Sequence, residues 1–376
     1  MGHGRPGGAI PPHRTTSPIT SEQPPAIFWN VDISMVRLHP VSLATTLHRS
    51  LVTEPHLLGG EAMRQARQWH HRERWGLILA GGDGLRLRPL TRLIAGDERP
   101  KQFCSVLARE SLLEQTRRRA ALAIPPARTL VVLTQTHERY YAPLVAGMPP
   151  HCAIVQPENR GTAAAILYGA LRIAATEPLG AVAVLPSDHY VSDDSVFMGH
   201  VAAAFLAVRA RPELVVLLGI TPESAETEYG WIEPAEPIPG SALCRVARFW
   251  EKPVPLLARV LLERGCLWNS FVMVARIPAL LAMIRSAAPD LERAFTAVQP
   301  MFGTAAENGA VRALYRHLAP LSFSDDVLAT RPANLAVLPV EGVRWSDWGQ
   351  PKRVMQTLGR LGIEPVWAER AAAQLA

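Results

Sequence analysis

The segment of residues 77–101 most constrains what this chain can fold into, because an apolar run leads directly into a glycine-rich loop. Residues 77–80 form a short apolar run, which is typical of a strand covered on both faces in a mostly parallel sheet. Gly81, Gly82 and Gly84 follow, and glycine lets the backbone approach a ligand so that successive N–H groups can face phosphate oxygens. The pattern predicts a strand that runs into a phosphate-binding loop.

Three cations follow this loop. Arg86 and Arg88 come directly after the glycines, and Lys101 follows a proline a short distance on. Cations beside a glycine loop suit a polyphosphate ligand, but a strand ending in a tight turn with ordinary surface arginines would show the same residues. The dinucleotide fingerprint is excluded because Leu87 stands where it needs a third glycine, and the Gly-Lys-Ser/Thr of a Walker loop is absent.

Lysine is rare and lies in or beside the candidate motifs. Of 39 Lys and Arg residues only Lys101, Lys252 and Lys352 are lysines, so these three are candidates for places that need a compact ammonium on a flexible stem. The formal net charge of +6 is too small to require a nucleic-acid partner, because phosphate substrates account for local positive charge equally well.

The composition divides the chain into an extension, one large domain and a tail. Residues 1–72 are the extension, which we expect to be disordered at least to about residue 26, because that part is rich in Gly, Pro, Ser and Thr. Residues 73–362 have the pattern of a folded domain, and 363–376 are a C-terminal tail. No apolar run is long enough to span a membrane, and residues 1–26 lack the apolar stretch of a signal peptide. We therefore expect a cytoplasmic protein without a membrane partner.

Strand-like and helix-like segments alternate through the domain. Strands are expected at 129–133, 153–156, 181–185, 214–220, 229–232, 246–250, 267–275 and 335–340. Helices are expected at 111–123, 162–176, 195–210, 255–264, 278–285, 311–317 and 350–361. This alternation predicts an α/β fold with a mixed, mostly parallel central sheet and helices on both faces, in which ligands bind beyond the carboxyl ends of the strands.

Two aspartates are placed to bind a metal ion. Asp188 lies just beyond the strand expected at 181–185, and Asp347 follows the strand expected at 335–340. Mg²⁺ prefers one or two carboxylates together with phosphate oxygens and water, so this pair would suit it. Each aspartate alone is more simply a turn or helix-capping residue, and only their pairing favours the metal role.

The segment 156–162 runs from a strand into a helix. Gln156 carries one acceptor and two donors, which can read the edge of a nucleobase. Arg160, Gly161 and Thr162 lead into the helix expected at 162–176, whose amino terminus suits close contact with a base or ribose. The same residues also fit an ordinary strand-to-helix turn.

Adjacent charges and amide groups further along suit a sugar phosphate. Lys252 could hold the phosphate and Glu251 a sugar hydroxyl, although a surface ion pair explains these two equally well. Gly230 and Asn269 each stand beside a tryptophan, and an aromatic ring with small or amide groups is usual equipment for binding a sugar ring.

Six motifs, taken together and in this order, resemble those of the sugar-1-phosphate nucleotidylyltransferases: GGDGLRLRPL, PK, LPSDH, EKP, WNS and WSDWG. The resemblance covers residues 75–361 and is greatest to the bacterial mannose-1-phosphate guanylyltransferases. It implies a Rossmann-like nucleotidyltransferase fold. It also implies transfer of a nucleotidyl group from a nucleoside triphosphate, GTP first, to a sugar 1-phosphate, mannose 1-phosphate first, with release of pyrophosphate.

The resemblance assigns roles to the residues singled out above. Arg86 would hold the departing pyrophosphate and Lys101 the reacting phosphates, while Asp188 and Asp347 would bind Mg²⁺. Gly81, Gly82 and Gly84 would cradle the nucleotide, beside Gln156, Arg160, Gly161 and Thr162. Gly230, Glu251, Lys252 and Asn269 would bind the sugar phosphate. The partners implied are the nucleoside triphosphate and the sugar 1-phosphate, and a homo-oligomer is left open.

Gln156 departs from the guanylyl branch, which usually has glutamate at this position, whereas the thymidylyl and uridylyl branches usually have glutamine. Guanine offers N–H donors that suit a carboxylate, so dTTP or UTP with a glucose-1-phosphate-type substrate is the alternative. A non-catalytic sugar-nucleotide-binding regulatory subunit is a further alternative. The intact Arg86, Lys101, Asp188 and Asp347 argue against it, because a pure binder needs neither the pyrophosphate contact nor the metal pair.

Overall fold

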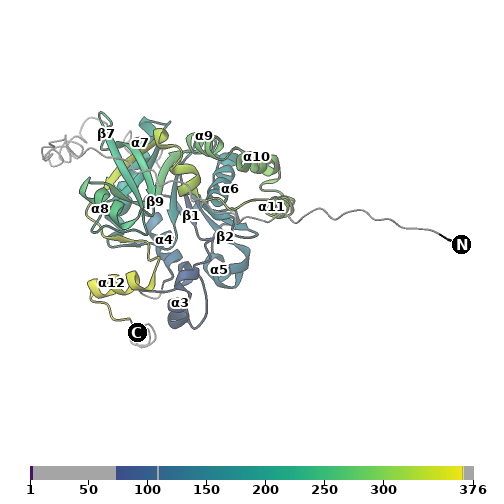
Figure 1. Ribbon diagram of the computed structural model, residues 1–376, viewed down its shortest axis with the longest axis horizontal. Coiled ribbons are helices and arrows are strands. Elements are labelled where there is room, and N and C mark those ends of the chain that lie inside the picture. The colour runs from purple at the N-terminus through teal and green to yellow at the C-terminus, as the bar shows by residue number, and fades with distance from the viewer. Residues whose placement is uncertain (3–72, 108–109, 366, 368–376) are drawn as a thin grey trace. The chain divides into compact units, whose positions relative to one another are not determined.

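A computed structural model describes residues 1–2, 73–107, 110–365 and 367. The chain divides into two units, Met1–Gly59 and Gly60–Ala376, and the helices and strands of the described residues belong to the second unit (Figure 1). Nearly all of the expected extension and most of the expected C-terminal tail lie outside the described residues.

A nine-stranded mixed sheet forms the centre of the second unit, in the order β3-β2-β1-β4-β9-β6-β10-β8-β7. Its strands are β1 (Arg74–Leu79), β2 (Thr129–Thr134), β3 (Ala153–Gln156), β4 (Ala181–Pro186), β6 (Val215–Ile220), β7 (Gly230–Pro237), β8 (Cys244–Glu251), β9 (Leu267–Arg276) and β10 (Leu335–Val340). Strands β1 to β4 pair in parallel, as do β6 and β10, while β9 runs antiparallel between β4 and β6. The carboxyl ends of these parallel strands therefore meet at one edge of the sheet.

A second, two-stranded sheet joins segments that are far apart in the sequence. It pairs β5 (Tyr190–Val191) with β11 (Trp345–Ser346) in antiparallel register, with Tyr190 opposite Ser346. Asp188 precedes β5 and Asp347 follows β11, so this short ladder carries both aspartates to the same end of the fold.

Helices pack on both faces of the large sheet (Figure 1). They are α4 (Leu112–Ala120), α5 (Glu138–Val145), α6 (Gly161–Thr176), α7 (Asp194–Ala210), α8 (Pro255–Glu263), α9 (Ile277–Ala287), α10 (Pro289–Val298) and α11 (Glu307–Tyr315). Helices α3 (Arg88–Ala95) and α12 (Pro351–Leu361) contribute to a separate hydrophobic cluster away from the large sheet (Figure 1). Leu77 packs with the α6, α9 and α10 side of the core and the next residue, Ile78, with the α4 and α7 side, and both are fully buried. Strand β1 is thus covered on both faces, as its unbroken apolar run predicted.

Most predicted elements are confirmed, whereas helices α3, α5 and α10 and strands β5 and β11 were not predicted. Ser111 caps α4 by accepting a hydrogen bond from the N–H of Glu114, whose carboxylate accepts from the N–H of Ser111, so the predicted capping box is present. Helix α5 was not predicted because it contains Pro143, and proline is unusual inside a helix. Strands β5 and β11 are each two residues long, too short for an alternating pattern.

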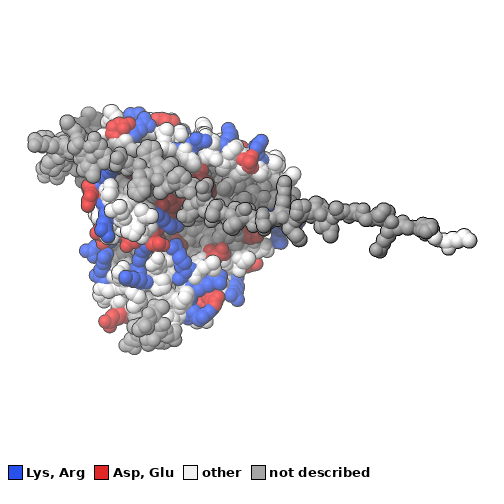
Figure 2. Space-filling view, in the orientation of Figure 1, with Lys and Arg blue, Asp and Glu red and all other residues white. Residues whose placement is uncertain are grey.

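The charged surface and the helices bear on the expectations drawn from composition. Basic and acidic side chains of the described residues lie intermixed on the face that Figure 2 shows. No helix in the described part of the chain combines the length and apolar character that crossing a membrane requires.

Candidate active site

The glycine loop after β1 lies against fixed neighbours at two positions and faces open space at a third. Gly84 has a φ of 59°, and a Cβ there would stand 3.2 Å from the main-chain nitrogen of Lys101. A Cβ at Gly81 would stand 2.7 Å from Nε2 of Gln156, so a side chain is excluded at Gly81 as well. A Cβ at Gly82 would meet nothing within 4 Å. The backbone at Gly82 is therefore where a ligand can approach closely.

Asp83 links this loop to two other segments, which sequence reasoning did not anticipate. Its Oδ1 lies 3.3 Å from Nε2 of His137, and its Oδ2 accepts a hydrogen bond from Nδ2 of Asn159 over 2.9 Å. Asn159 in turn accepts from the N–H of Gly161 at the start of α6. The loop and the amino terminus of α6 are thus connected through two side chains.

Lys101 lies between the two segments that carry the predicted metal ligands. Its ammonium stands 3.3 Å from Oδ2 of Asp188 and donates to the main-chain oxygens of Asp347 and Trp348. The side chain is buried, so it is held in place rather than free in solvent. The fold therefore brings the segments that carry Asp188 and Asp347 to one ammonium group, which contacts the carboxylate of Asp188 and the main chain of Asp347.

The carboxylate of Asp347 is oriented by its neighbours. Its Oδ1 accepts hydrogen bonds from the N–H of Gly349 at 2.8 Å and from Nη1 of Arg353 at 2.7 Å. Burial acts to raise the pKa of Asp347, but the positive charges of Lys101 and Arg353 outweigh burial and lower that pKa. No hydrogen bond from the described residues reaches Oδ2, which leaves that oxygen available to a ligand.

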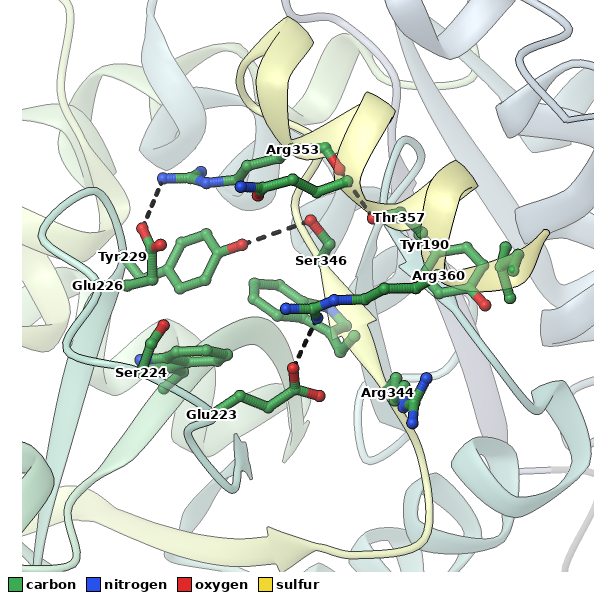
Figure 3. Close-up of a pocket in the computed structure, with 14 residues that line it drawn as sticks. Tyr190, Glu223, Ser224, Glu226, Tyr229, Arg344, Ser346, Arg353, Thr357 and Arg360 are labelled. Carbon is green, nitrogen blue, oxygen red and sulfur yellow. Dashed lines mark hydrogen bonds and ion pairs between the residues drawn. The ribbon is translucent and has the colours of Figure 1, made fainter. Parts of the chain in front are cut away.

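Arg353, on α12, contacts Asp347 and also lines the polar pocket shown in Figure 3. Its Nη2 lies 3.0 Å from Oε2 of Glu226, and its guanidinium stands 4.4 Å from the centroid of the Tyr229 ring. Figure 3 shows these three side chains near Ser346, whose hydroxyl is 3.4 Å from that of Tyr229. No local signal in the sequence marks Arg353 or Glu226, because their importance comes from contacts between distant segments.

His189 is adjacent to Asp188 but is suited to packing rather than to proton transfer. Burial lowers the pKa of His189 to about 4, so the imidazole is neutral near pH 7. Its ring packs edge-on against Trp345, with the two ring centroids 5.1 Å apart.

The predicted cations Arg86 and Arg88 form ion pairs at the surface. Arg86 lies 3.2 Å from Glu228, and Arg88 lies 3.5 Å from Glu98. Both pairs are well exposed, and ion pairs of this kind contribute only about 0–1 kcal/mol. Arg86 can therefore exchange Glu228 for a phosphate at little cost, but the structure does not itself place it beside Lys101.

Three of the four predicted sugar-phosphate residues lie in direct contact. A Cβ at Gly230 would stand 2.9 Å from Oε2 of Glu251 and 3.3 Å from Cβ of Asn269. Burial raises the pKa of Glu251, while the ammonium of Lys252, 3.3 Å away, opposes that rise. Sequence reasoning proposed these residues separately, and antiparallel pairing of β7 with β8 and β9 joins them.

Backbone strain gathers in the same motifs. Lys252, Phe271 and Trp348 are the non-glycine residues of the described chain with positive φ, at 43°, 61° and 46°. Phe271 lies where β9 loses register with β6, and its N–H donates to Oδ1 of Asn269 over 3.0 Å. Such strain costs about 1–3 kcal/mol per residue and occurs preferentially at functional sites.

The predicted nucleotide-binding residues at the start of α6 make contacts within the protein. Gly161 has a φ of 83°, and a Cβ there would stand 2.2 Å from the main-chain oxygen of Leu321. The hydroxyl of Thr162 accepts a hydrogen bond from the N–H of Phe323 over 2.8 Å. Arg160 lies 2.8 Å from Glu158. The fold itself therefore requires glycine at position 161.

Comparison with known proteins places the chain in one family and finds relatives in sugar-nucleotide and polysaccharide biosynthesis by name. Residues 75–358 match the family described as nucleotidyl transferase. The xanthan biosynthesis protein XanB of Xanthomonas campestris pv. campestris is 30% identical over 283 residues, which are 73% of this chain and 57% of XanB. A mannose-1-phosphate guanylyltransferase of Sinorhizobium fredii is 32% identical over 283 residues, 72% of this chain and 52% of that protein. The chain thus spans about half the length of these curated relatives.

A solved structure supports the expected fold. The protein described as a mannose-1-phosphate geranyltransferase from Thermus thermophilus has a TM-score of 0.65 and 30% sequence identity to this chain. The similarity covers 75% of this chain and 79% of that one. The predicted nucleotidyltransferase fold is therefore confirmed.

Proposed function

Because this chain belongs to the nucleotidyl transferase family, we propose that it transfers a nucleotidyl group from a nucleoside triphosphate to a sugar 1-phosphate. GTP and mannose 1-phosphate are the first candidates, in keeping with the relatives named as mannose-1-phosphate guanylyltransferases. One observation carries the proposal most directly. Lys101 joins Asp188 and Asp347 at the sheet edge where the glycine loop also ends.

The proposed reaction is an in-line displacement at phosphorus. An oxygen of the sugar phosphate forms a bond to the α-phosphorus, and the bond from that phosphorus to the bridging oxygen of the β-phosphate breaks. The electron pair leaves with pyrophosphate. Because the attacking oxygen is already anionic at neutral pH, no strong general base is needed, and alignment and charge neutralisation supply the catalysis.

The chain's own residues are suited to these tasks. The ammonium of Lys101 neutralises charge on the reacting phosphates, and the open backbone at Gly82 accommodates the triphosphate. Arg86 leaves its exposed pair with Glu228 to hold the departing pyrophosphate. Lys252 binds the phosphate of the incoming sugar phosphate.

The two aspartates suit Mg²⁺, which would neutralise phosphate charge when bound. Mg²⁺ uses one or two carboxylates and takes its other ligands from phosphates and water. Asp347 offers Oδ2 for this purpose, and Asp188 lies across the shared Lys101. The described residues contain no group of three or more His, Cys, Asp or Glu that could hold a metal ion.

A second candidate is favoured by one residue. The Gln156 side chain carries an amide where the guanylyl branch usually carries a carboxylate, so dTTP or UTP with a glucose 1-phosphate is the competing substrate pair. The Gln156 amide lies beside Gly81 in the loop, where it could meet a base.

Pyrophosphate release decides between these candidates. It is measured with Mg²⁺ for GTP, dTTP, UTP, ATP and CTP, each with mannose 1-phosphate and with glucose 1-phosphate. Release with GTP and mannose 1-phosphate supports the first candidate, and release with dTTP or UTP supports the second. No release with any pair would overturn the proposed function and favour a non-catalytic binding subunit.

Lys101→Ala tests the residue on which the proposal depends. We expect kcat to fall by at least about 100-fold, since a donor aimed at developing charge is typically worth that much. Lys352→Ala is the matched control, because it removes the same charge from an exposed position on α12. Equal activity in the two variants would refute the assigned role of Lys101.

A further inference from the structure

Gln156 has a fixed orientation at the end of β3. The residue is 2% exposed, and its Oε1 accepts a hydrogen bond from the hydroxyl of Tyr315 over 2.9 Å. Its Nε2 lies on the side of Gly81, 2.7 Å from where a Cβ would stand on that glycine. The NH₂ group of the amide therefore faces the glycine loop, and the oxygen faces the core.

Tyr315 determines which end of the amide faces the loop. Burial raises the pKa of Tyr315, so its hydroxyl keeps its proton and must donate it. Among the described residues, Oε1 of Gln156 is the acceptor for that proton. If the amide turned over, its NH₂ would meet the hydroxyl and the tyrosine proton would be buried without an acceptor, which is unfavourable.

The surroundings hold the Tyr315 hydroxyl in place. Tyr315 is fully buried at the end of α11, with its ring edge-on to Phe295 at a centroid distance of 6.0 Å. At the start of α11, both carboxylate oxygens of Glu307 accept hydrogen bonds from Arg172 on α6. Helix α11 is thus fastened to the helix that begins beside the glycine loop.

The NH₂ group of Gln156 has no hydrogen-bond acceptor among the described residues, so it lacks a partner that a ligand beside Gly81 could supply. An NH₂ group can bond to a keto oxygen, such as O6 of guanine or O4 of uracil and thymine. Adenine and cytosine carry an amino group at the corresponding position, and two donors cannot bond to each other.

We propose that Tyr315 is a positioning residue that presents Gln156 as a hydrogen-bond donor, so that the site selects nucleotides whose base carries a keto oxygen. This inference rests on the proposed function. It accounts for a glutamine that can serve guanine as well as uracil or thymine, and it places the choice of base in a tyrosine some 159 residues away in the sequence.

The test compares Tyr315→Phe with a matched control. Tyr168→Phe also removes a buried tyrosine hydroxyl from the cluster around Phe295, but that hydroxyl bonds to Glu307 and not to Gln156. For each enzyme, kcat/KM is measured with GTP, UTP, ATP and CTP and the better sugar phosphate. The readout is the ratio of keto to amino nucleotides, which general loss of stability does not change.

We expect the wild-type protein to favour GTP or UTP over ATP and CTP. In Tyr315→Phe the amide is free to rotate and accept from an amino group, so the ratio should fall about tenfold, the value of one hydrogen bond. In Tyr168→Phe the ratio should stay at the wild-type value. An unchanged ratio in Tyr315→Phe, an equal fall in Tyr168→Phe, or a wild-type protein that uses ATP as readily as GTP would overturn the inference.

Gln156→Glu provides an independent test that does not depend on the folding of a tyrosine variant. The hydroxyl of Tyr315 would bond to one carboxylate oxygen and leave the other as an acceptor facing the base. Guanine offers two adjacent donors, N1–H and its amino group, to that oxygen, whereas uracil offers only N3–H between two keto oxygens, which the carboxylate repels. The GTP to UTP ratio should rise about tenfold. A ratio that stays constant would count against the inference, whereas absence of turnover in the wild-type protein would instead refute the proposed function.

Discussion

Arg353 donates from Nη1 to Oδ1 of Asp347 over 2.7 Å, and its Nη2 lies 3.0 Å from a carboxylate oxygen of Glu226. Arg353 is 8% exposed, and its guanidinium links a carboxylate of the proposed reaction centre to one that lines the pocket in Figure 3. Helix α12 is therefore fastened to the site by a side chain that the motif itself does not contain.

Removing Arg353 should destabilise the protein far more than removing Arg360, another arginine on the same helix. Arg353→Ala removes a cation from Glu226 and one of the two cations beside Asp347, and we expect a loss of about 3 kcal/mol, at the low end for buried pairs because Glu226 is 34% exposed. The Arg360 pair with Glu223 is also short, at 2.7 Å, but its side chains are 59% and 45% exposed. Arg360→Ala should therefore cost less than about 1 kcal/mol. Urea unfolding measures both, and equal losses would show that burial does not decide the difference.

Glu307 should make stability depend on pH in the acid range. Burial acts to raise the pKa of Glu307, but hydrogen bonds from Tyr168, Gly303 and Arg172 outweigh burial and lower that pKa in the folded state. A lowered folded pKa means that the carboxylate's contribution is complete above its unfolded value of about 4.3 and is lost as the pH falls through the folded value.

Glu307→Gln measures this contribution. The variant should be about 1–3 kcal/mol less stable than the wild-type protein at pH 7, and the difference should shrink as the pH falls below about 4. Glu213→Gln is the control, because that glutamate is exposed and should give little difference at any pH. Urea unfolding from pH 7 to 3 provides the measurement, and a difference for Glu307→Gln that is constant over this range would contradict the linkage.

The sequence was sufficient for the fold because the patterns that specify it are local. The apolar run at β1, the capping box at Ser111 and the alternation of strands and helices each depend on residues within one turn or strand. The clustering of Gly230, Glu251 and Asn269 followed once the strands paired.

The parts that could not be predicted depend on contacts between distant segments. Tyr315 meets Gln156 because α11 packs against α6, and Arg353 meets Glu226 because α12 lies near the start of β7. Arginine and tyrosine are both common on helices, so nothing in the sequence marks Arg353 or Tyr315 as part of the site. The positive φ of Trp348 likewise depends on how its loop closes over Lys101.

The cysteines should react slowly while the protein is folded. Burial raises the pKa of the Cys104 thiol to about 12 and that of Cys266 to about 11, and it also raises the pKa values of Cys152 and Cys244. Only the thiolate reacts, so modification by a disulfide reagent at pH 8 should be slow, with Cys244 the first to react because it is half-buried. Unfolding in urea should expose four thiols at once, and rapid native modification of Cys104 would contradict the burial.

Gly82→Ala separates a glycine kept for a ligand from one kept for the fold. A Cβ at Gly82 meets nothing within 4 Å and its φ is not positive, so the variant should unfold at the same urea concentration as the wild-type protein. If triphosphate oxygens approach this backbone, the new methyl group should raise KM for the nucleotide about tenfold with a smaller effect on the sugar phosphate.

Gly199→Ala on α7 also adds a methyl group in open space, and it should leave both KM values unchanged. Gly161→Ala should fail in the opposite way, losing stability because its Cβ would overlap Leu321. A Gly82→Ala protein with unchanged nucleotide KM would mean that the triphosphate lies elsewhere than at this loop.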